Sequence, residues 1–341
     1  MVAEEKKTWS SRLSFLRTKR AIFVLTMLVI VSVVLIALGA TNVFGARNSS
    51  DVPSSSSIQQ PTQSDAAKNG ITIAPGTWNP DNSSSIADGI PLRIMPLGAS
   101  VVKGENSTKK YGFRKTMRDG LVKLGSPVNM VGSQRYGEML DNDLEAYGGQ
   151  KITELYEHAQ DIVPQEQPNL FIINVGTNNV LQNNSVDLAG EQLGDLIDYV
   201  LEASPRSTVI YSTLLTNLVK DSEPMILDIN QQYRKLINRF DSKPVIMVEM
   251  HYGQGFPNRP QVKDIGPDLT HPTDYGYELM AHLFLQAIQE ADRQGYLRKP
   301  VDNGLQLNGN LGRLAATTTT TELPPATSSA SSSAVNSTLG R

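Results

Sequence analysis

Between residues 92 and 291, short apolar runs alternate with longer segments that have helical periodicity. The apolar runs predict five strands, at 92–97, 128–131, 170–175, 207–211 and 244–248. The intervening and following segments predict five helices, at 112–124, 152–162, 190–203, 225–240 and 272–291. Strands that are apolar on both faces are typical of parallel sheets covered by helices on either side. The alternation therefore predicts a three-layer α/β/α sandwich with a five-stranded parallel sheet.

Residues 21–40 form a run of twenty residues without a charged side chain. Twenty helical residues span about 30 Å, the thickness of the hydrocarbon core of a bilayer. Six Lys and Arg residues precede this run, whereas only Arg47 follows it closely. The positive-inside rule therefore predicts a single-pass type II membrane protein, with residues 1–20 in the cytosol and the rest of the chain luminal or extracellular. The alternative is a signal peptide cleaved after Gly39 or Ala40, which would give a secreted protein.

Two polar segments flank the predicted domain at residues 91–297. Residues 41–90 are rich in Ser, Asn and Pro, a composition typical of a linker, and residues 298–341 predict a Ser/Thr-rich disordered tail. The chain also contains five Asn-X-Ser/Thr sequons, which fit glycosylation in the secretory pathway. These lie at Asn48, Asn82, Asn106, Asn183 and Asn336.

Composition narrows the classes of ligand. The chain has no cysteine, so disulfides and thiolate metal sites are impossible. Residues 1–20 carry four net positive charges; because the whole chain has a net charge of −3, residues 21–341 carry −7. This charge predicts no attraction to nucleic acid. His158 and His282 lie on predicted helices without a partner at ligand spacing, so no metal site is predicted.

The first predicted strand ends at Gly98, and Ser100 follows two residues later. In open α/β sheets, ligands bind beyond the carboxyl ends of the strands. A serine at that edge can act as a nucleophile if the chain also supplies a base, an orienting carboxylate and an oxyanion hole. The alternative is a serine that merely lies in a turn or caps a helix.

Other residues at the same sheet edge could supply these groups. Asp268 and His271 are three residues apart in a turn before the last predicted helix, where Pro272 suits the first helical position. In such a turn the carboxylate can hold the imidazole tautomer. Asn178 follows the third strand and could donate to an oxyanion, and Gly132 follows the second strand with an unobstructed backbone N–H. Each residue alone also fits a turn, but together they predict an active site.

In this chain order, Ser, Gly, Asn and the Asp/His pair resemble the four sequence blocks of the SGNH, or GDSL-type, hydrolase superfamily, whose fold is flavodoxin-like. The resemblance covers about residues 91–292. Several runs are similar to the fungal acetyl xylan esterases of carbohydrate esterase family three. These runs are Ile94-Met95-Pro96-Leu97-Gly98, Tyr111-Gly112-Phe113-Arg114, Val131-Gly132-Ser133 and His271-Pro272.

The resemblance implies a role for each matching residue. Ser100 would be the nucleophile and His271 the general base, oriented by Asp268. The backbone amides of Ser100 and Gly132, with the side chain of Asn178, would form the oxyanion hole. The implied activity is that of a serine esterase, without a metal or organic cofactor, which removes small acyl groups such as acetyl from a carbohydrate through an acyl-enzyme.

The chain departs from the family pattern at several positions. Ala99 and Asn179 stand where the family usually has Asp, and Tyr147 stands where it commonly has His. These departures leave two alternatives open: an O-acyltransferase of the same fold, and a carbohydrate-binding surface protein without turnover. Lys103, three residues after the serine, is interpreted as a solvated loop charge. His251, after the fifth strand, is the alternative candidate for the base.

Overall fold

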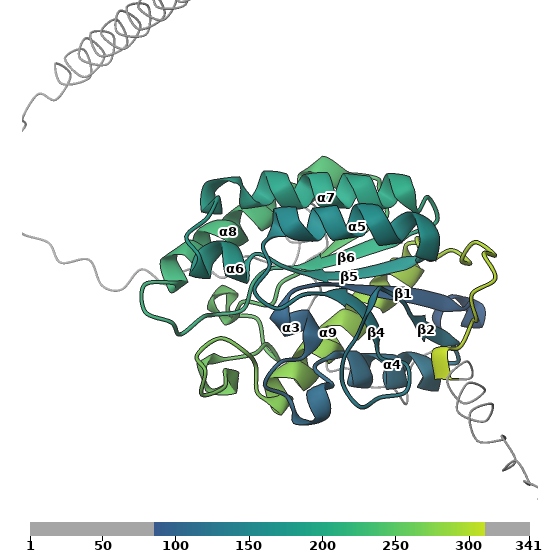
Figure 1. Cartoon of the computed structure of the whole chain (residues 1–341), viewed down its shortest axis with the longest axis horizontal. Helices are drawn as coiled ribbons and strands as arrows, with labels where there is room; N and C mark the ends of the chain where they lie inside the picture. The colour runs from purple at the N-terminus through teal and green to yellow at the C-terminus, as the bar shows by residue number, and fades with distance from the viewer. Residues whose placement is uncertain (1–84, 311–341) are drawn as a thin grey trace, which may run out of the picture. The chain divides into compact units, whose positions relative to one another are not determined.

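The computed structural model describes residues 85–310, and its centre is a mostly parallel sheet between two layers of helices (Figure 1). The strands follow the order β3-β4-β1-β5-β6-β7, and β2 also pairs with β1. All of these pairings are parallel except that of β3 with β4. The strands are β1 (Leu92–Gly98), β2 (Val128–Met130), β3 (Gln134–Arg135), β4 (Asp143–Ala146), β5 (Leu170–Asn174), β6 (Thr208–Ser212) and β7 (Val245–Val248). The predicted α/β sandwich is confirmed.

The sheet has seven strands rather than five, because the loop expected after β2 contains β3 and β4. β2 pairs only with Leu92–Ile94 at the start of β1. β4 pairs with Leu97 and Gly98, at the carboxyl end of β1. The chain thus leaves this edge of β1 after β2 and returns to it with β4. These two added strands are short and carry charged side chains, so they lack the apolar pattern by which the other strands are predicted.

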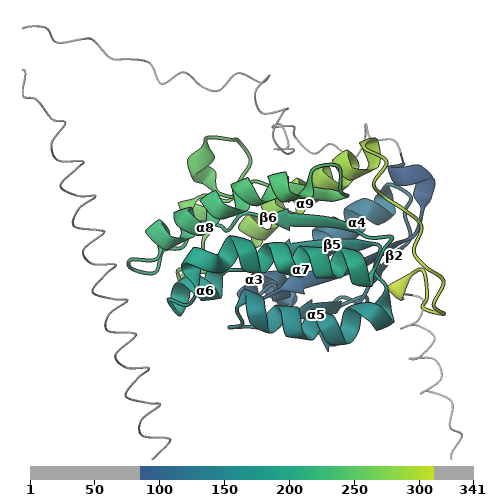
Figure 2. The ribbon, with the colours of Figure 1, turned by 90° about the horizontal axis from the view of Figure 1, so that it is seen from above.

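Five long helices correspond to the five predicted ones, and two short helices, α3 and α6, were not predicted. The helices are α3 (Ser100–Lys103), α4 (Arg114–Lys123), α5 (Ile152–Glu166), α6 (Thr177–Leu181), α7 (Ala189–Ala203), α8 (Glu223–Leu236) and α9 (Asp274–Arg293). α4 and α9 cover one face of the sheet, and α5, α7 and α8 cover the other (Figures 1 and 2).

Alternating strand residues build a core on each face of the sheet. Ile94 and Ile172 pack toward α4 and α9, whereas Met95 and Phe171 pack toward α5, α7 and α8. All four side chains are buried, and full burial of such a side chain stabilises the fold by about 1.5–3 kcal/mol. A sheet packed on both faces holds the carboxyl ends of its strands in fixed positions, and the candidate catalytic residues follow those ends.

The folded domain extends beyond the expected boundaries at residues 91 and 297. Ile86 is buried within a short 3-10 turn (Ile86–Gly89) that precedes β1. At the other end, Arg93 Nη1 donates to the carbonyl of Val301 at 3.1 Å, and Asn129 Nδ2 donates to the carbonyl of Gln306 at 2.8 Å. The first part of the expected tail therefore belongs to the domain, because its backbone carbonyls bind side chains of β1 and β2.

The expected membrane span and three of the sequons lie outside the described residues. Within residues 85–310, no helix has both the length and the apolar character that a membrane crossing requires. The two sequons in this part of the chain, Asn106 and Asn183, are both exposed.

Candidate active site

The carboxyl end of β1 makes a close approach to its neighbours that requires glycine. A Cβ atom at Gly98 would lie 2.3 Å from the carbonyl oxygen of Asn174 and 2.4 Å from Cγ2 of Val102. These separations are shorter than any side chain tolerates, so glycine lets β1 run directly into α3. Ser100 is the first residue of α3 and is 9% exposed. The candidate nucleophile thus lies at the sheet edge where ligands bind in this class of fold.

A closed turn before α9 holds the candidate base. Ile265 and Pro272 form an antiparallel bridge across the base of the turn. Within it, the Gly266 N–H donates to the carbonyl of His271 at 2.7 Å. The helix begins at Asp274, and the side chain of Thr273 caps it. Pro272 therefore precedes the helix rather than occupying its first position, because its backbone pairs with Ile265 instead.

Asp268 binds both the backbone and the imidazole of this turn. Its Oδ1 accepts the backbone N–H groups of Thr270 and His271 at 3.1 and 3.0 Å, and its Oδ2 lies 2.7 Å from His271 Nδ1. Partial burial raises the pKa of the Asp268 carboxyl, but these hydrogen bonds outweigh burial and bring the pKa below its ordinary value. The carboxylate is therefore ionised and is placed to accept the Nδ1–H of the imidazole.

The opposite nitrogen of the same ring is left as a proton acceptor. His271 Nε2 is buried and has no hydrogen-bond partner among residues 85–310. With the proton held on Nδ1, the Nε2 lone pair is available to a hydroxyl group. This is the arrangement that a serine nucleophile needs in its base.

Ser100, Asn178, Asp268 and His271 line one pocket of about 480 Å³. They come from α3, α6 and the turn before α9, so the fold brings together three segments that are far apart in sequence. The other lining residues are Lys103, Glu105, Gly148, Gly149, Leu181 and Thr270. Leu181 is the only large apolar side chain among the ten. The pocket is therefore suited to a small, polar substrate.

Asn178 keeps one amide proton for a ligand. Its Nδ2 donates to the carbonyl of Gln150 at 2.9 Å, which fixes the orientation of the side chain. A primary amide carries two N–H donors, so one remains. Asn178 lines the same pocket as Ser100, and its second N–H supports the predicted contribution to an oxyanion hole. That contribution stays a prediction.

Gly132 has a structural reason to be glycine and does not line the pocket. Its φ is +144°, and a Cβ atom there would lie 2.2 Å from the carbonyl carbon of Leu144 in β4. The return of the chain along β1 therefore requires glycine at this position. The predicted role of its backbone N–H in the oxyanion hole remains a prediction.

Two of the departures from the family pattern lie outside the pocket lining. Asn179 is buried; its Oδ1 accepts the Ile152 N–H at the start of α5, and its Nδ2 donates to the carbonyl of Asn184. Ala99 precedes α3 and leaves this short helix without a side-chain cap. Asn179 and Ala99 therefore belong to the structure behind the pocket, and neither forms the surface that a substrate contacts.

Tyr147, the third departure, does not line the pocket either. Its ring stacks on that of His158 at 3.9 Å, and its hydroxyl donates to the buried carboxylate of Glu145 at 2.8 Å. The same carboxylate accepts the backbone N–H of Ser133 at 2.7 Å. Tyr147 thus belongs to a polar cluster that stabilises the loop around β3 and β4.

His251 is a structural histidine. It is 2% exposed and does not line the pocket, and its Nε2 lies 2.8 Å from Oε1 of Glu223. Its Nδ1 accepts the backbone N–H of Gly253 at 3.1 Å, so both ring nitrogens are engaged. Among the described residues, no group of three or more His, Asp or Glu side chains is placed to hold a metal ion.

Sequence reasoning misjudged one pocket residue, Lys103, and missed another, Glu105. Lys103 is not a solvated loop charge: its ammonium lies 3.4 Å from Oε1 of Glu105 and 4.4 Å from the ring centroid of Tyr136. The segment that carries both residues is held by Arg114, whose Nη2 donates to the carbonyls of Lys103, Lys110 and Tyr136 at 2.9 Å each. Burial lowers the pKa of Arg114 to about 10. The Tyr-Gly-Phe-Arg run was the sequence signal for this support.

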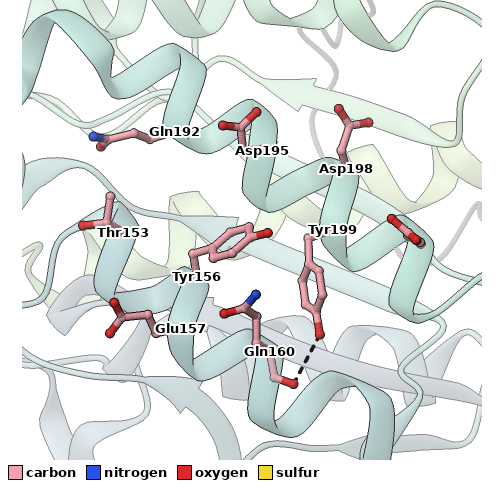
Figure 3. A pocket seen from close by; sticks show the side chains of 9 residues that line it. Thr153, Tyr156, Glu157, Gln160, Gln192, Asp195, Asp198 and Tyr199 are labelled. Atoms are coloured by element: carbon pink, nitrogen blue, oxygen red, sulfur yellow. Dashed lines mark hydrogen bonds between the residues drawn. The ribbon is translucent and has the colours of Figure 1, made fainter.

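A larger cavity of about 680 Å³ lies between α5 and α7, where the rings of Tyr156 and Tyr199 lie next to each other among acidic and amide side chains (Figure 3). Asp195 and Asp198 on this surface pair with Arg239. None of the residues that line this cavity is a serine or a histidine. The smaller pocket therefore remains the candidate active site.

Comparisons with known proteins concern the family and the fold. Residues 120–279 match the sequence profile of the GDSL-like Lipase/Acylhydrolase family. No curated protein sequence is similar enough to match the chain.

Solved structures show the same fold. A carbohydrate esterase family 3 structure from Talaromyces cellulolyticus is 18% identical, covers 60% of this chain and 99% of its own, and has a TM-score of 0.51. A family 3 carbohydrate esterase from Clostridium thermocellum is 22% identical, with 59% and 98% coverage and a TM-score of 0.51. An acetyl esterase mutant with an acetate ion is 18% identical, with 60% and 99% coverage and the same TM-score.

Proposed function

We propose that this chain is an ester hydrolase that removes small acyl groups, acetyl foremost, from a carbohydrate; the match of residues 120–279 to the GDSL-like Lipase/Acylhydrolase family supports the hydrolase activity. The observation that carries the proposal is the Asp268–His271 contact of 2.7 Å in a pocket that Ser100 also lines. The choice of a small acyl group and a sugar rests on the polar lining of that pocket. The fold shared with carbohydrate esterases of family 3 supports the same choice.

The proposed mechanism is a double displacement. Ser100 Oγ attacks the ester carbonyl carbon while its proton passes to His271 Nε2, and the carbonyl oxygen becomes an oxyanion that Asn178 helps to bind. The intermediate collapses, the bond to the alcohol breaks, and the proton on Nε2 passes to the departing oxygen. Water then attacks the acyl-enzyme with His271 again as base, and the acid leaves with Ser100 restored. Asp268 stabilises the imidazolium in each half of the cycle.

The acyl preference tests the proposed substrate class. We expect the purified full-length protein to release acetate from acetylated oligosaccharides and to hydrolyse p-nitrophenyl acetate with a higher kcat/KM than longer acyl esters. An apolar acyl channel would instead gain about 0.8 kcal/mol for each buried CH₂ group, or roughly fourfold in kcat/KM. A steady rise of kcat/KM with acyl length would therefore contradict the proposal. Acetyl transfer to an added sugar, without release of acetate, would identify an acyltransferase.

For its location, we propose a glycosylated type II membrane protein anchored by residues 21–40, with the hydrolase domain outside the cytosol. The uncharged run, the basic residues before it and the sequons support this. The full-length protein should remain in the membrane pellet after carbonate extraction, and endoglycosidase treatment should lower its apparent mass. A soluble product with a new amino terminus near residue 40 would show that the run is a cleaved signal peptide.

A further inference from the structure

Glu105 places a second carboxylate beside the catalytic imidazole. Its Oε2 lies 3.9 Å from His271 Nε2, the nitrogen opposite the one that Asp268 binds. Its Oε1 lies 3.4 Å from the ammonium of Lys103, which orients the carboxylate. The side chain is 32% exposed and lines the pocket, so Oε2 faces the space that a substrate occupies.

The backbone of Glu105 is fixed on both sides. Its N–H donates to the carbonyl of Ser100 at 3.1 Å, and its own carbonyl accepts the hydroxyl of Tyr277 at 2.8 Å. Tyr277 is buried in α9, the helix that follows the His271 turn. Two hydrogen bonds, one to Ser100 and one to Tyr277 of α9, therefore hold the backbone of Glu105 in place.

The opposite wall of the pocket leaves room for this carboxylate. A Cβ atom at Gly148 would lie 2.7 Å from Oε1 of Glu105. A larger residue would push the carboxylate out of its position, whereas glycine allows the close approach. The site therefore places one oriented carboxylate against the reacting nitrogen.

The position of Glu105 relative to Nε2 decides which part of an ester it meets. In the collapse of the tetrahedral intermediate, Nε2 gives its proton to the departing alcohol oxygen, which must therefore lie about 3 Å from Nε2. Glu105 flanks the same nitrogen, so it lies on the alcohol side of the ester. A hydroxyl one carbon beyond the carbon that carries the departing oxygen can then reach Oε2.

We propose that Glu105 is an alcohol-side subsite, whose carboxylate accepts a hydrogen bond from a hydroxyl on the carbon next to the ester-bearing carbon. The preferred substrates are then monoesters of vicinal diols, as in a partly acylated sugar ring. This inference rests on the proposed esterase function and deepens it. The Lys103 ammonium lies 3.4 Å from Oε1 and leaves Oε2 as the acceptor for this hydroxyl.

A pair of acetates that differ only in this hydroxyl tests the inference. 2-Hydroxyethyl acetate has the hydroxyl, and propyl acetate has a methyl group in its place. We expect the full-length wild-type protein to hydrolyse the first with a kcat/KM about tenfold or more above the second, since a hydrogen bond to a charged group is among the stronger ones. Glu105→Ala should bring the two values close to each other, and Glu105→Gln, which keeps one acceptor oxygen, should retain part of the preference.

Glu138→Gln is the matched control, because Glu138 pairs with Lys109 on the surface and does not line the pocket. It should keep the wild-type preference. Equal rates on the two acetates in the wild type would overturn the inference. So would a loss in Glu105→Ala by the same factor on both, which would mean that Glu105 acts only through His271. Failure of the wild type on these acetates and on p-nitrophenyl acetate would overturn the proposed function, and this inference with it.

Discussion

Ser100→Ala is expected to lower kcat/KM on a small ester by about 10⁴-fold or more without changing the fold. Only the hydroxyl of Ser100 begins the covalent route, and loss of a serine nucleophile leaves little beyond the oxyanion hole and substrate binding. The side chain is small and lies at the start of a four-residue helix, so its removal leaves the packing of the sheet unchanged. The measurement is steady-state hydrolysis of p-nitrophenyl acetate, with thermal unfolding as a check on the fold.

Ser126→Ala is the matched control. Ser126 is also buried, but it precedes β2, lies outside the pocket, and its hydroxyl donates to the carbonyl of Ile86 at 3.5 Å. It should leave kcat/KM within a fewfold of wild type. A loss of kcat/KM of less than about tenfold in Ser100→Ala, which is about 1.4 kcal/mol of activation free energy, would show that Ser100 is not the nucleophile.

Asp268→Asn is expected to lower kcat/KM by about 10² to 10⁴-fold while the turn keeps its shape. The amide oxygen of asparagine can still accept the backbone N–H groups of Thr270 and His271, which Asp268 Oδ1 binds now. Its NH₂ group would then face His271 Nδ1 and donate to it. The ring proton would move to Nε2, and the base would lose the lone pair that Ser100 needs. The corresponding change in a serine protease costs about 10⁴-fold in kcat.

The pH profile separates this role from a structural one. Since its hydrogen bonds hold the pKa of Asp268 below the ordinary value, the carboxylate stays ionised throughout the ordinary titration range of a carboxyl and is neutralised only as the pH falls through its lowered pKa. The acid-side fall of wild-type kcat/KM, expected because His271 must be neutral to accept a proton, should therefore reflect His271. A wild-type profile that is flat from pH 5 to 9 would contradict this.

Asp274→Asn provides the comparison for Asp268→Asn. Asp274 also accepts hydrogen bonds near the start of α9, from the backbone and hydroxyl of Thr108, but it does not line the pocket. It should stay near wild-type activity. An Asp268→Asn variant as fast as wild type would mean that the turn around His271 serves the fold rather than the chemistry.

The central strands could be predicted because their signal is local. β1 and β5 are apolar on both faces, and their observed bounds, Leu92–Gly98 and Leu170–Asn174, lie within one residue of the expected ranges. α5 runs on to Glu166 although Pro164 lies inside it, whereas the helix was expected to end at 162. Proline usually ends a helix because it has no N–H, but here the carbonyl of Gln160, which loses that helical partner, accepts the hydroxyl of Tyr199 at 3.2 Å. Packing against the sheet, which periodicity does not report, decides that boundary.

The site could be predicted only where its residues form motifs. Ser100, Asn178 and the Asp268–His271 pair each follow a strand or precede a helix at a recognisable spacing, and the structure gathers them around one pocket. Glu105 has no such signal, because it reaches His271 through the fold of the segment after α3. Gly104, with φ +78°, reverses the chain there, and only the three-dimensional structure shows which side chain then faces the imidazole.

Covalent labelling tests the central claim, that Ser100 forms an acyl-enzyme with His271 as its base, most directly. A phosphonate ester with a p-nitrophenyl leaving group mimics the tetrahedral intermediate and stays on the nucleophile. We expect one phosphonyl group per full-length chain, located by peptide mapping at Ser100, absent from Ser100→Ala and formed far more slowly in Asp268→Asn. A label on another residue, or labelling of Ser100→Ala by the same reagent at the wild-type rate, would contradict the account.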